Sequence, residues 1–194
     1  MGLKNYAATI KPFRVILEQY DVALDNIEQR SLQNMTLISS GAGVWPVGPY
    51  QSYCTLGEAI AIESLLRREL GHQYALELTA AFEAKIVYYF RHHVKRGSVA
   101  RTAFRDAVPA MVFQNLRPMM FGHVIDIFKS LIYPNDPITY ADNCNLMDYR
   151  NWLAHGRAWD LNKNILSKFD FLYTLDVIKS TMDRLPNFPT ELRD

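Results

Sequence analysis

The chain has 194 residues, of which 49% are hydrophobic and 21% are charged, so it can form one domain with a sizeable core. Its 21 basic and 20 acidic side chains give a net charge of +1, which excludes a chain-wide positive field and restricts any RNA surface to a local patch. Cys54 and Cys144 lack metal or redox spacing, and neither a leader nor an apolar run of membrane-spanning length is visible. We therefore expect a cytoplasmic protein with free thiols and no membrane contact.

The first predicted elements are a helix and a long loop. From Pro12, which suits a first helical turn, apolar residues recur at three- and four-residue steps as far as Ile27, and the helix is expected to run on toward Met35. Glycine, proline and aromatic residues then crowd residues 41–54, a composition that breaks regular structure. This loop is interpreted either as a flap whose aromatic side chains cover the core or as a functional segment.

The next pattern predicts two helices separated by Gly71. Thr55 followed by Glu58 forms a capping box at the start of the first helix, over residues 56–70. The positions expected to face the interior are Ile60, Ala61, Ser64 and Leu65. The second helix is predicted over residues 73–95 and carries an apolar stripe along one face.

The densest group of basic side chains lies around the predicted stop of this helix at Gly97. Its members are Arg91, His92, His93, Lys95, Arg96, Arg101 and Arg105. The group is interpreted either as a solvated helix end or as a patch that contacts RNA phosphates. His92 and His93 are adjacent and would point about 100° apart on a helix, so they make a poor metal pair and no metal site is expected.

Apolar residues dominate the stretch 108–132. Pro118 inside it predicts a kink or two shorter helices, because proline removes a helical hydrogen bond and clashes with the preceding turn. The expected core residues are Met111, Val112, Leu116, Met119, Met120, Val124, Ile127, Phe128 and Leu131. The methionines are interpreted as core filler.

A turn-rich loop over residues 133–142 leads into another predicted helix, which Asp142 or Asn143 would cap and which Gly156 would end.

After that helix, a break at 160–164 precedes a last helix over 165–184 and an extended tail over 186–194. No strand alternation or repeat is visible. The fold predicted for residues 1–194 is therefore an all-α, single-domain bundle of five to seven helices.

A short segment at the end of the penultimate predicted helix carries residue types that suit phosphate chemistry. Arg150 is a permanent cation with a planar fork of donors, and His155 can exchange a proton near neutral pH. On a straight helix these two side chains point roughly 140° apart, whereas Asn151 and His155 share a face. Either the helix ends between Arg150 and His155, or a second copy completes the site across a two-fold axis; we favour the second arrangement.

The arrangement from Arg150 to His155, R-N-x-x-x-H, resembles the R-x(4–6)-H motif of HEPN-superfamily ribonucleases. These are all-helical, usually dimeric, metal-independent RNA-cleaving domains of toxin–antitoxin and antiviral defence systems. The resemblance covers six residues and implies a HEPN-like endoribonuclease without cofactors, a homodimer with a composite site at its interface, RNA as substrate and a cognate antitoxin protein as a further partner. Glu83, after Phe82 in a long predicted helix, resembles the acidic core-helix position of many HEPN domains and would pair with Arg150.

The resemblance also implies a role for each motif residue. His155 would act as general base on the 2′-hydroxyl or as general acid on the leaving oxygen, and Arg150 would stabilise charge on the phosphate. Asn151 would orient the imidazole or a phosphate oxygen. Arg157 and the basic group at 91–105 would extend the contact with the RNA backbone. The products would be a 2′,3′-cyclic phosphate and a 5′-hydroxyl.

Two other interpretations remain open. One is a catalytically silent HEPN-like module that binds RNA or a partner protein, and the other is an unrelated helical adaptor, in which His155 and Arg150 are ordinary surface residues. Trp152 and Trp159 are interpreted as packing residues rather than as platforms for bases. The sequence patterns of serine hydrolases, P-loop enzymes and zinc proteins are absent.

Overall fold

The computed structural model describes residues 10–41, 55–114 and 119–194, and within these ranges the chain forms helices and no strand. The elements are α2 (Phe13–Ser39), α3 (Leu56–His92), α4 (Val99–Ala107), α5 (Ala110–Phe113), α6 (Phe121–Leu131), α7 (Pro137–Ala154), α8 (Lys163–Lys168), α9 (Phe171–Arg184) and the 3-10 helix η1 (Thr190–Leu192). The all-α prediction is confirmed. The eight α-helices of the described ranges exceed the expected five to seven, partly because α5 and α8 have only four and six residues.

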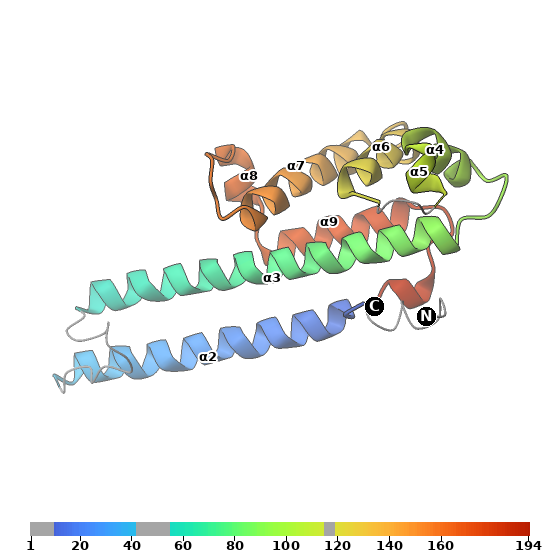
Figure 1. The fold of residues 1–194 in the computed structure, drawn as a ribbon. Helices are drawn as coiled ribbons and strands as arrows, with labels where there is room; N and C mark the ends of the chain where they lie inside the picture. Colours follow the sequence, from blue (N-terminus) through green and yellow to red (C-terminus); the bar gives the residue numbers. More distant parts are fainter. Residues whose placement is uncertain (1–9, 42–54, 115–118) are drawn as a thin grey trace.

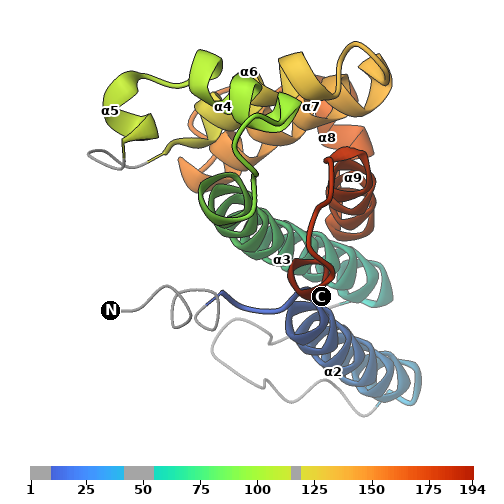
Figure 2. The same cartoon turned by 90° about the vertical axis from the view of Figure 1, so that its right-hand side faces the viewer.

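The longest helix, α3, organises the fold. It runs antiparallel to α2, while α7 and α9 lie on its other sides (Figures 1 and 2). Helices α4 and α6 pack on one another and reach α3 near its C-terminal end, and α6 also contacts α7. The core therefore forms along the C-terminal part of α3. Among the described residues, no helix is both long enough and apolar enough to cross a bilayer.

The far end of the α2–α3 pair projects beyond the other helices (Figure 1). Ile60 and Leu65, which were expected to face the interior, are 49% and 48% exposed. That expectation was wrong because, within residues 10–41, 55–114 and 119–194, α2 is the one helix beside this part of α3, and it covers one face. The loop predicted over residues 41–54 lies, beyond Gly41, outside the described residues.

The predicted break at Gly71 is also wrong, since α3 is continuous from Leu56 to His92. Glycine inside a helix costs about 1 kcal/mol relative to alanine, which burial of the surrounding residues can offset. Gly97, in contrast, has φ +79° and stands in the turn after α3. Helix α3 nevertheless ends at His92, before the predicted end at residue 95, and His93 is its C-cap residue, so the left-handed Gly97 belongs to the following turn and not to the helix end.

The C-terminal residues differ from the expected extended tail. Phe188 and Leu192 are buried, and Leu192 is the last residue of η1. The Tyr89 hydroxyl donates to the Pro186 carbonyl oxygen at 2.5 Å, and the Lys85 ammonium group donates to the Leu192 carbonyl oxygen at 3.0 Å. This segment is therefore part of the core on α3.

The stretch 108–132 forms two shorter helices, α5 and α6, which was one of the two predicted outcomes. Pro118, on which that prediction rested, lies outside the described residues. The branched and aromatic core residues expected there are buried: Val112, Val124, Ile127, Phe128 and Leu131. Met111 and Met120 are 45% and 68% exposed, so the prediction that they fill the core is wrong. Met111 lies in the four-residue helix α5, Met120 is the N-cap residue of α6, and Leu116 is outside the described residues.

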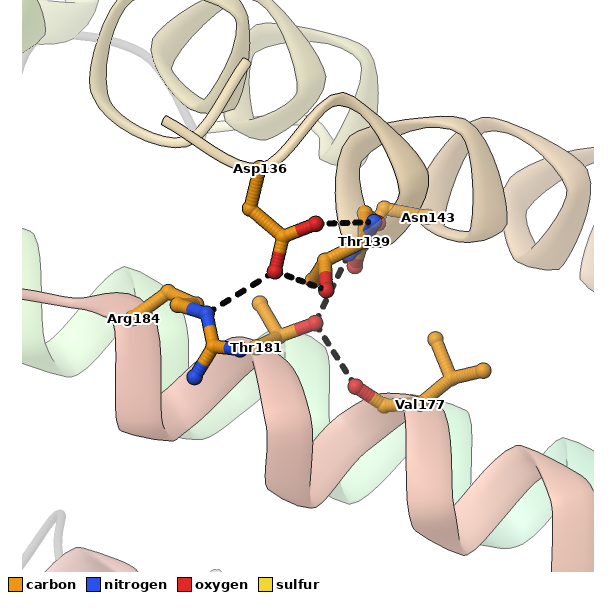
Figure 3. A network of polar contacts seen from close by, with 6 residues as sticks. All are labelled: Asp136, Thr139, Asn143, Val177, Thr181 and Arg184. Atoms are coloured by element: carbon orange, nitrogen blue, oxygen red, sulfur yellow. Dashed lines mark hydrogen bonds and ion pairs between the residues drawn. The ribbon is translucent and has the colours of Figure 1, made fainter. Parts of the chain in front are cut away.

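Helix α7 starts earlier than predicted, because Asp136 rather than Asp142 or Asn143 caps it. Asp136 accepts from the Thr139 backbone N–H at 3.0 Å, and Pro137 occupies the first helical position. This hydrogen bond, with those from the Thr139 hydroxyl and from Arg184, lowers the pKa of Asp136 to about 2. The cap therefore also joins α7 to α9 (Figure 3).

A buried polar network continues this junction (Figure 3). The side-chain amide of Asn143, which is 0% exposed, donates to the Thr139 carbonyl oxygen and to the Thr181 hydroxyl, both at 2.7 Å. The Thr181 hydroxyl in turn donates to the Val177 carbonyl oxygen at 2.7 Å. Most buried polar groups in proteins are paired, and these contacts fix the register between α7 and α9.

The chain after α7 forms two helices where one was expected. Residues 163–168 form α8, and Asp170 starts α9 by accepting from the Tyr173 backbone N–H at 2.7 Å. The motif helix is therefore third from last, and α8 lies beside its C-terminal end (Figure 1).

Candidate functional site

The end of α7 is shaped by a helix-terminating turn. His155 is the C-cap residue, the Gly156 N–H donates to the Leu153 carbonyl oxygen at 3.3 Å, and the Arg157 N–H donates to the Trp152 carbonyl oxygen at 2.9 Å. This pair of bonds is the Schellman arrangement, which requires a left-handed residue at the position of Gly156, where φ is +67°. The helix thus ends at His155 and exposes its imidazole.

Arg150 makes the contact with Glu83 that the sequence resemblance implied. Its Nε lies 2.7 Å from Oε1 of Glu83, without the alignment of a hydrogen bond, and Nη2 donates to Oε2 at 3.3 Å. The two side chains are partly buried. Burial raises the pKa of Glu83, and the Arg150 charge opposes that rise.

Asn151 connects this ion pair to the pocket that contains His155. Its Oδ1 accepts from Nη1 of Arg150 at 3.2 Å, and the residue also lines the pocket. Arg150 itself does not line it. Within one chain, the arginine and the histidine therefore lie on either side of Asn151, which agrees with the angular separation expected on a helix.

The pocket is an open hollow of about 770 Å³ beside the end of α7. Its wall includes residues of α7, of the connection after it and of α8. They are Asp148, Asn151, His155, Ala158, Trp159, Asp160, Leu161, Asn162 and Ile165. Asp148, Asn151 and His155 stand three and four residues apart, so they form one stripe along α7.

The Arg157 side chain is about one third exposed, and its guanidinium group is bound to residues of α3. Its guanidinium group holds both carboxylate oxygens of Glu69, at 2.8 and 2.6 Å, and lies 2.9 Å from Nδ1 of His72. It also covers the ring of Trp152 at 5.2 Å. Burial and then the Arg157 charge lower the pKa of His72, which keeps this imidazole neutral beside the arginine. Arg157 thus ties the turn after His155 to α3.

The basic group at 91–105 lies far from His155. It occupies the end of α3 and helix α4, at the opposite end of α7 from α8 (Figure 1). Arg101 stacks over the Phe113 ring at 4.4 Å, and Arg105 pairs with Asp106 at 2.8 Å. Lys95 and Arg96 are exposed.

The sequence interpretation did not assign Trp159 to the site. Trp152 is buried, as predicted, but Trp159 is 45% exposed, lines the pocket and has its ring centroid 5.8 Å from that of His155. The sequence contains a feature that predicts an exposed Trp159 ring. Trp159 follows Gly156 by three residues, and the segment after Gly156 is too short and polar to bury a large side chain.

The described residues contain no group of three or more histidine, cysteine or acidic side chains that could hold a metal ion. The arrangement can nevertheless transfer protons through His155 and hold an anion through Arg150. Comparisons with protein-family models, with curated proteins and with solved structures give no match to this chain.

Proposed function

We propose that the chain is a HEPN-type, metal-independent endoribonuclease that acts in the cytoplasm as a toxin or antiviral-defence effector. The observation that carries the proposal is the layout of the R-N-x-x-x-H segment. Its arginine is oriented by Glu83, its asparagine bridges to the pocket, and its histidine is exposed at the helix end. A cognate antitoxin protein would restrain such an activity in the host.

The chemistry follows from RNA, which supplies its own nucleophile. The 2′-hydroxyl oxygen attacks phosphorus, the P–O5′ bond breaks, and a 2′,3′-cyclic phosphate and a 5′-hydroxyl result. His155 takes the 2′ proton or gives a proton to the departing 5′ oxygen. Arg150 stabilises the charge that grows on the non-bridging oxygens. This transfer needs neither a metal nor a cofactor.

A homodimer would bring these two residues to one phosphate. In a single chain Arg150 and His155 are separated around α7, with Asn151 between them. A two-fold axis beside the end of α7 would place His155 of one chain near Arg150 of the other.

The direct test is cleavage of a mixed cellular RNA pool in excess EDTA by wild type, Arg150→Ala, Asn151→Ala and His155→Ala. We expect wild type to leave cyclic phosphate ends and the His155 variant to lose about 10²- to 10⁴-fold in rate. Arg14→Ala, which removes an exposed arginine on α2, is the control and should cleave like wild type. Equal cutting by all the variants would refute the assignment of the motif.

Mixing the inactive variants tests the composite site. If each site takes Arg150 from one chain and His155 from the other, a heterodimer of Arg150→Ala and His155→Ala holds one intact site. Random mixing should then restore about one quarter of wild-type activity. If the mixture has no activity while wild type is active, each chain carries a complete site.

A catalytically silent HEPN-like module that binds RNA or a partner protein is the second candidate. One observation favours it: Arg150 is already paired with Glu83, so less of its charge is available to a phosphate. A folded wild-type protein that binds RNA without cutting it, in the presence or absence of EDTA, would move this function ahead.

A further inference from the structure

The pocket beside His155 has the size and lining of a site for one nucleotide. Its volume of about 770 Å³ lies within the range of roughly 300–1,000 Å³ that is usual for small-molecule sites. The buried Ile165 lines the pocket together with residues that carry amide, carboxylate and imidazole groups. An apolar lining with a few polar groups is typical of ligand sites.

Trp159 is held in place on the wall of this pocket. The Trp152 indole N–H, on α7, donates to the Trp159 carbonyl oxygen at 2.9 Å, and this bond fixes the backbone that carries the exposed ring. The ring is inclined at 44° to the His155 imidazole. A positioned, exposed indole next to a proton-transfer residue offers a stacking surface for a base.

Two carboxylates complete the pocket and indicate which base it accepts. Asp148 and Asp160 are exposed there, and neither has a hydrogen-bond or ion-pair partner in the described part of the chain. Ionised carboxylates only accept hydrogen bonds, so a ligand group that binds them must present N–H or O–H donors rather than phosphate oxygens. Guanine has two adjacent donors, N1–H and the N2 amino group, which match the two oxygens of a carboxylate.

We propose that this pocket is a guanine subsite, in which the base stacks on Trp159 and its N1–H and N2 amino groups bind Asp148 or Asp160. This inference rests on the proposed ribonuclease function and names its substrate. The guanosine would lie on the 5′ side of the scissile phosphate, with its ribose toward His155. Cleavage would then leave guanosine 2′,3′-cyclic phosphate ends.

The test measures binding separately from cleavage. Calorimetric titration of the full chain with 3′-GMP, 3′-IMP, 3′-CMP and 3′-UMP should give tightest binding for 3′-GMP. Inosine lacks the N2 amino group, so 3′-IMP should bind roughly tenfold more weakly or worse. Trp159→Ala should weaken 3′-GMP binding by roughly 5- to 150-fold, whereas Trp159→Phe, which keeps an aromatic face, should stay within a few-fold of wild type.

The carboxylates are tested by Asp148→Asn and Asp160→Asn, since an amide cannot accept both guanine donors. At least one of these variants should lose the preference for 3′-GMP over 3′-IMP. Equal binding of all four nucleotides, no binding of any, or selective binding of an arginine-rich peptide would each overturn the proposal. The comparison of 3′-GMP with 3′-IMP uses the wild-type protein. It therefore tests the proposal even where a variant fails to fold.

Cleavage distinguishes this proposal from the function on which it rests. If wild type cuts RNA and the fragment ends show no excess of guanosine, the ribonuclease function stands and the guanine subsite is refuted. If the chain selects 3′-GMP and cuts no RNA, the subsite stands and the ribonuclease function is refuted.

Discussion

Arg157 and Glu69 lie 88 residues apart in sequence and form a two-pronged ion pair, with Nη1–Oε1 and Nη2–Oε2 distances of 2.8 and 2.6 Å. The pair joins the turn after His155 to α3. The backbone of Arg157 is left-handed, with φ +63°, a conformation that is uncommon for residues other than glycine. The contacts of its side chain with Glu69 and His72 compensate for this strain.

Glu69→Gln should weaken this junction in a pH-dependent way. The hydrogen bond from Arg157 lowers the pKa of Glu69, so the pair stabilises the fold above the unfolded pKa of about 4.3 and loses that effect as pH falls through the folded pKa. Since both side chains are more than one third exposed, the loss at pH 7 should stay below about 1 kcal/mol. Urea unfolding at pH 7 and pH 3 measures this loss in the free energy of unfolding, and Glu18→Gln on α2 is the control. A loss relative to wild type that is the same at both pH values would contradict the prediction.

Arg150→Gln should destabilise the protein more at pH 7 than at pH 4. The pKa of Glu83 is raised in the folded state. The contribution of Glu83 to the free energy of unfolding is therefore most favourable below its unfolded pKa of about 4.3, and it is lost as the pH rises through the folded pKa. Without Arg150 the pKa rises further, and an unpaired carboxylate at pH 7 should cost about 1–3 kcal/mol. Urea unfolding at the two pH values measures the difference. The control is Arg184→Gln, which removes an exposed arginine from its ion pair with Asp136. Equal losses at the two pH values would argue against a partly buried, mutually dependent pair.

Gly156→Ala and Gly71→Ala should have opposite signs. A Cβ atom would meet nothing within 4 Å at either position, so only the backbone distinguishes them. Gly156→Ala, at a left-handed position, should lower the free energy of unfolding by about 1–2 kcal/mol. Gly71→Ala, inside α3, should raise it by about 0.5–1 kcal/mol. Thermal unfolding of both variants checks this. If Gly156→Ala is neutral, the Schellman turn does not hold His155 as described.

Thr181→Val and Thr174→Val form a second matched pair on α9. Both threonines are 0% exposed, but only the Thr181 hydroxyl accepts from Asn143, at 2.7 Å, whereas the Thr174 hydroxyl has no partner among the described residues. Thr181→Val should therefore cost about 1–3 kcal/mol, and Thr174→Val should be neutral or slightly stabilising. Urea unfolding gives both values. A Thr174 variant as unstable as the Thr181 variant would show that the network in Figure 3 is not the cause.

Local sequence rules determined the helical character of the chain and several helix ends. The Thr55–Glu58 capping box was readable because its two hydrogen bonds, at 2.7 and 3.3 Å, join residues three apart. The end of α7 before Gly156 was predictable from sequence because glycine adopts the left-handed conformation more readily than other residues. The separation of Arg150 from His155 around α7 follows from helix geometry alone.

Only the tertiary structure decided where Gly71, Arg157 and Trp159 belong. Gly71 stays helical because packing along α3 outweighs a local cost of about 1 kcal/mol. Arg157 is bound to Glu69 on α3, and the exposed Trp159 meets His155 because the chain turns back after α7. Helix geometry specifies contacts between residues about four apart inside one helix. It does not specify the contact of His155 with Trp159, which lies beyond the end of α7, or partners 85 or more residues apart, which depend on how the chain packs.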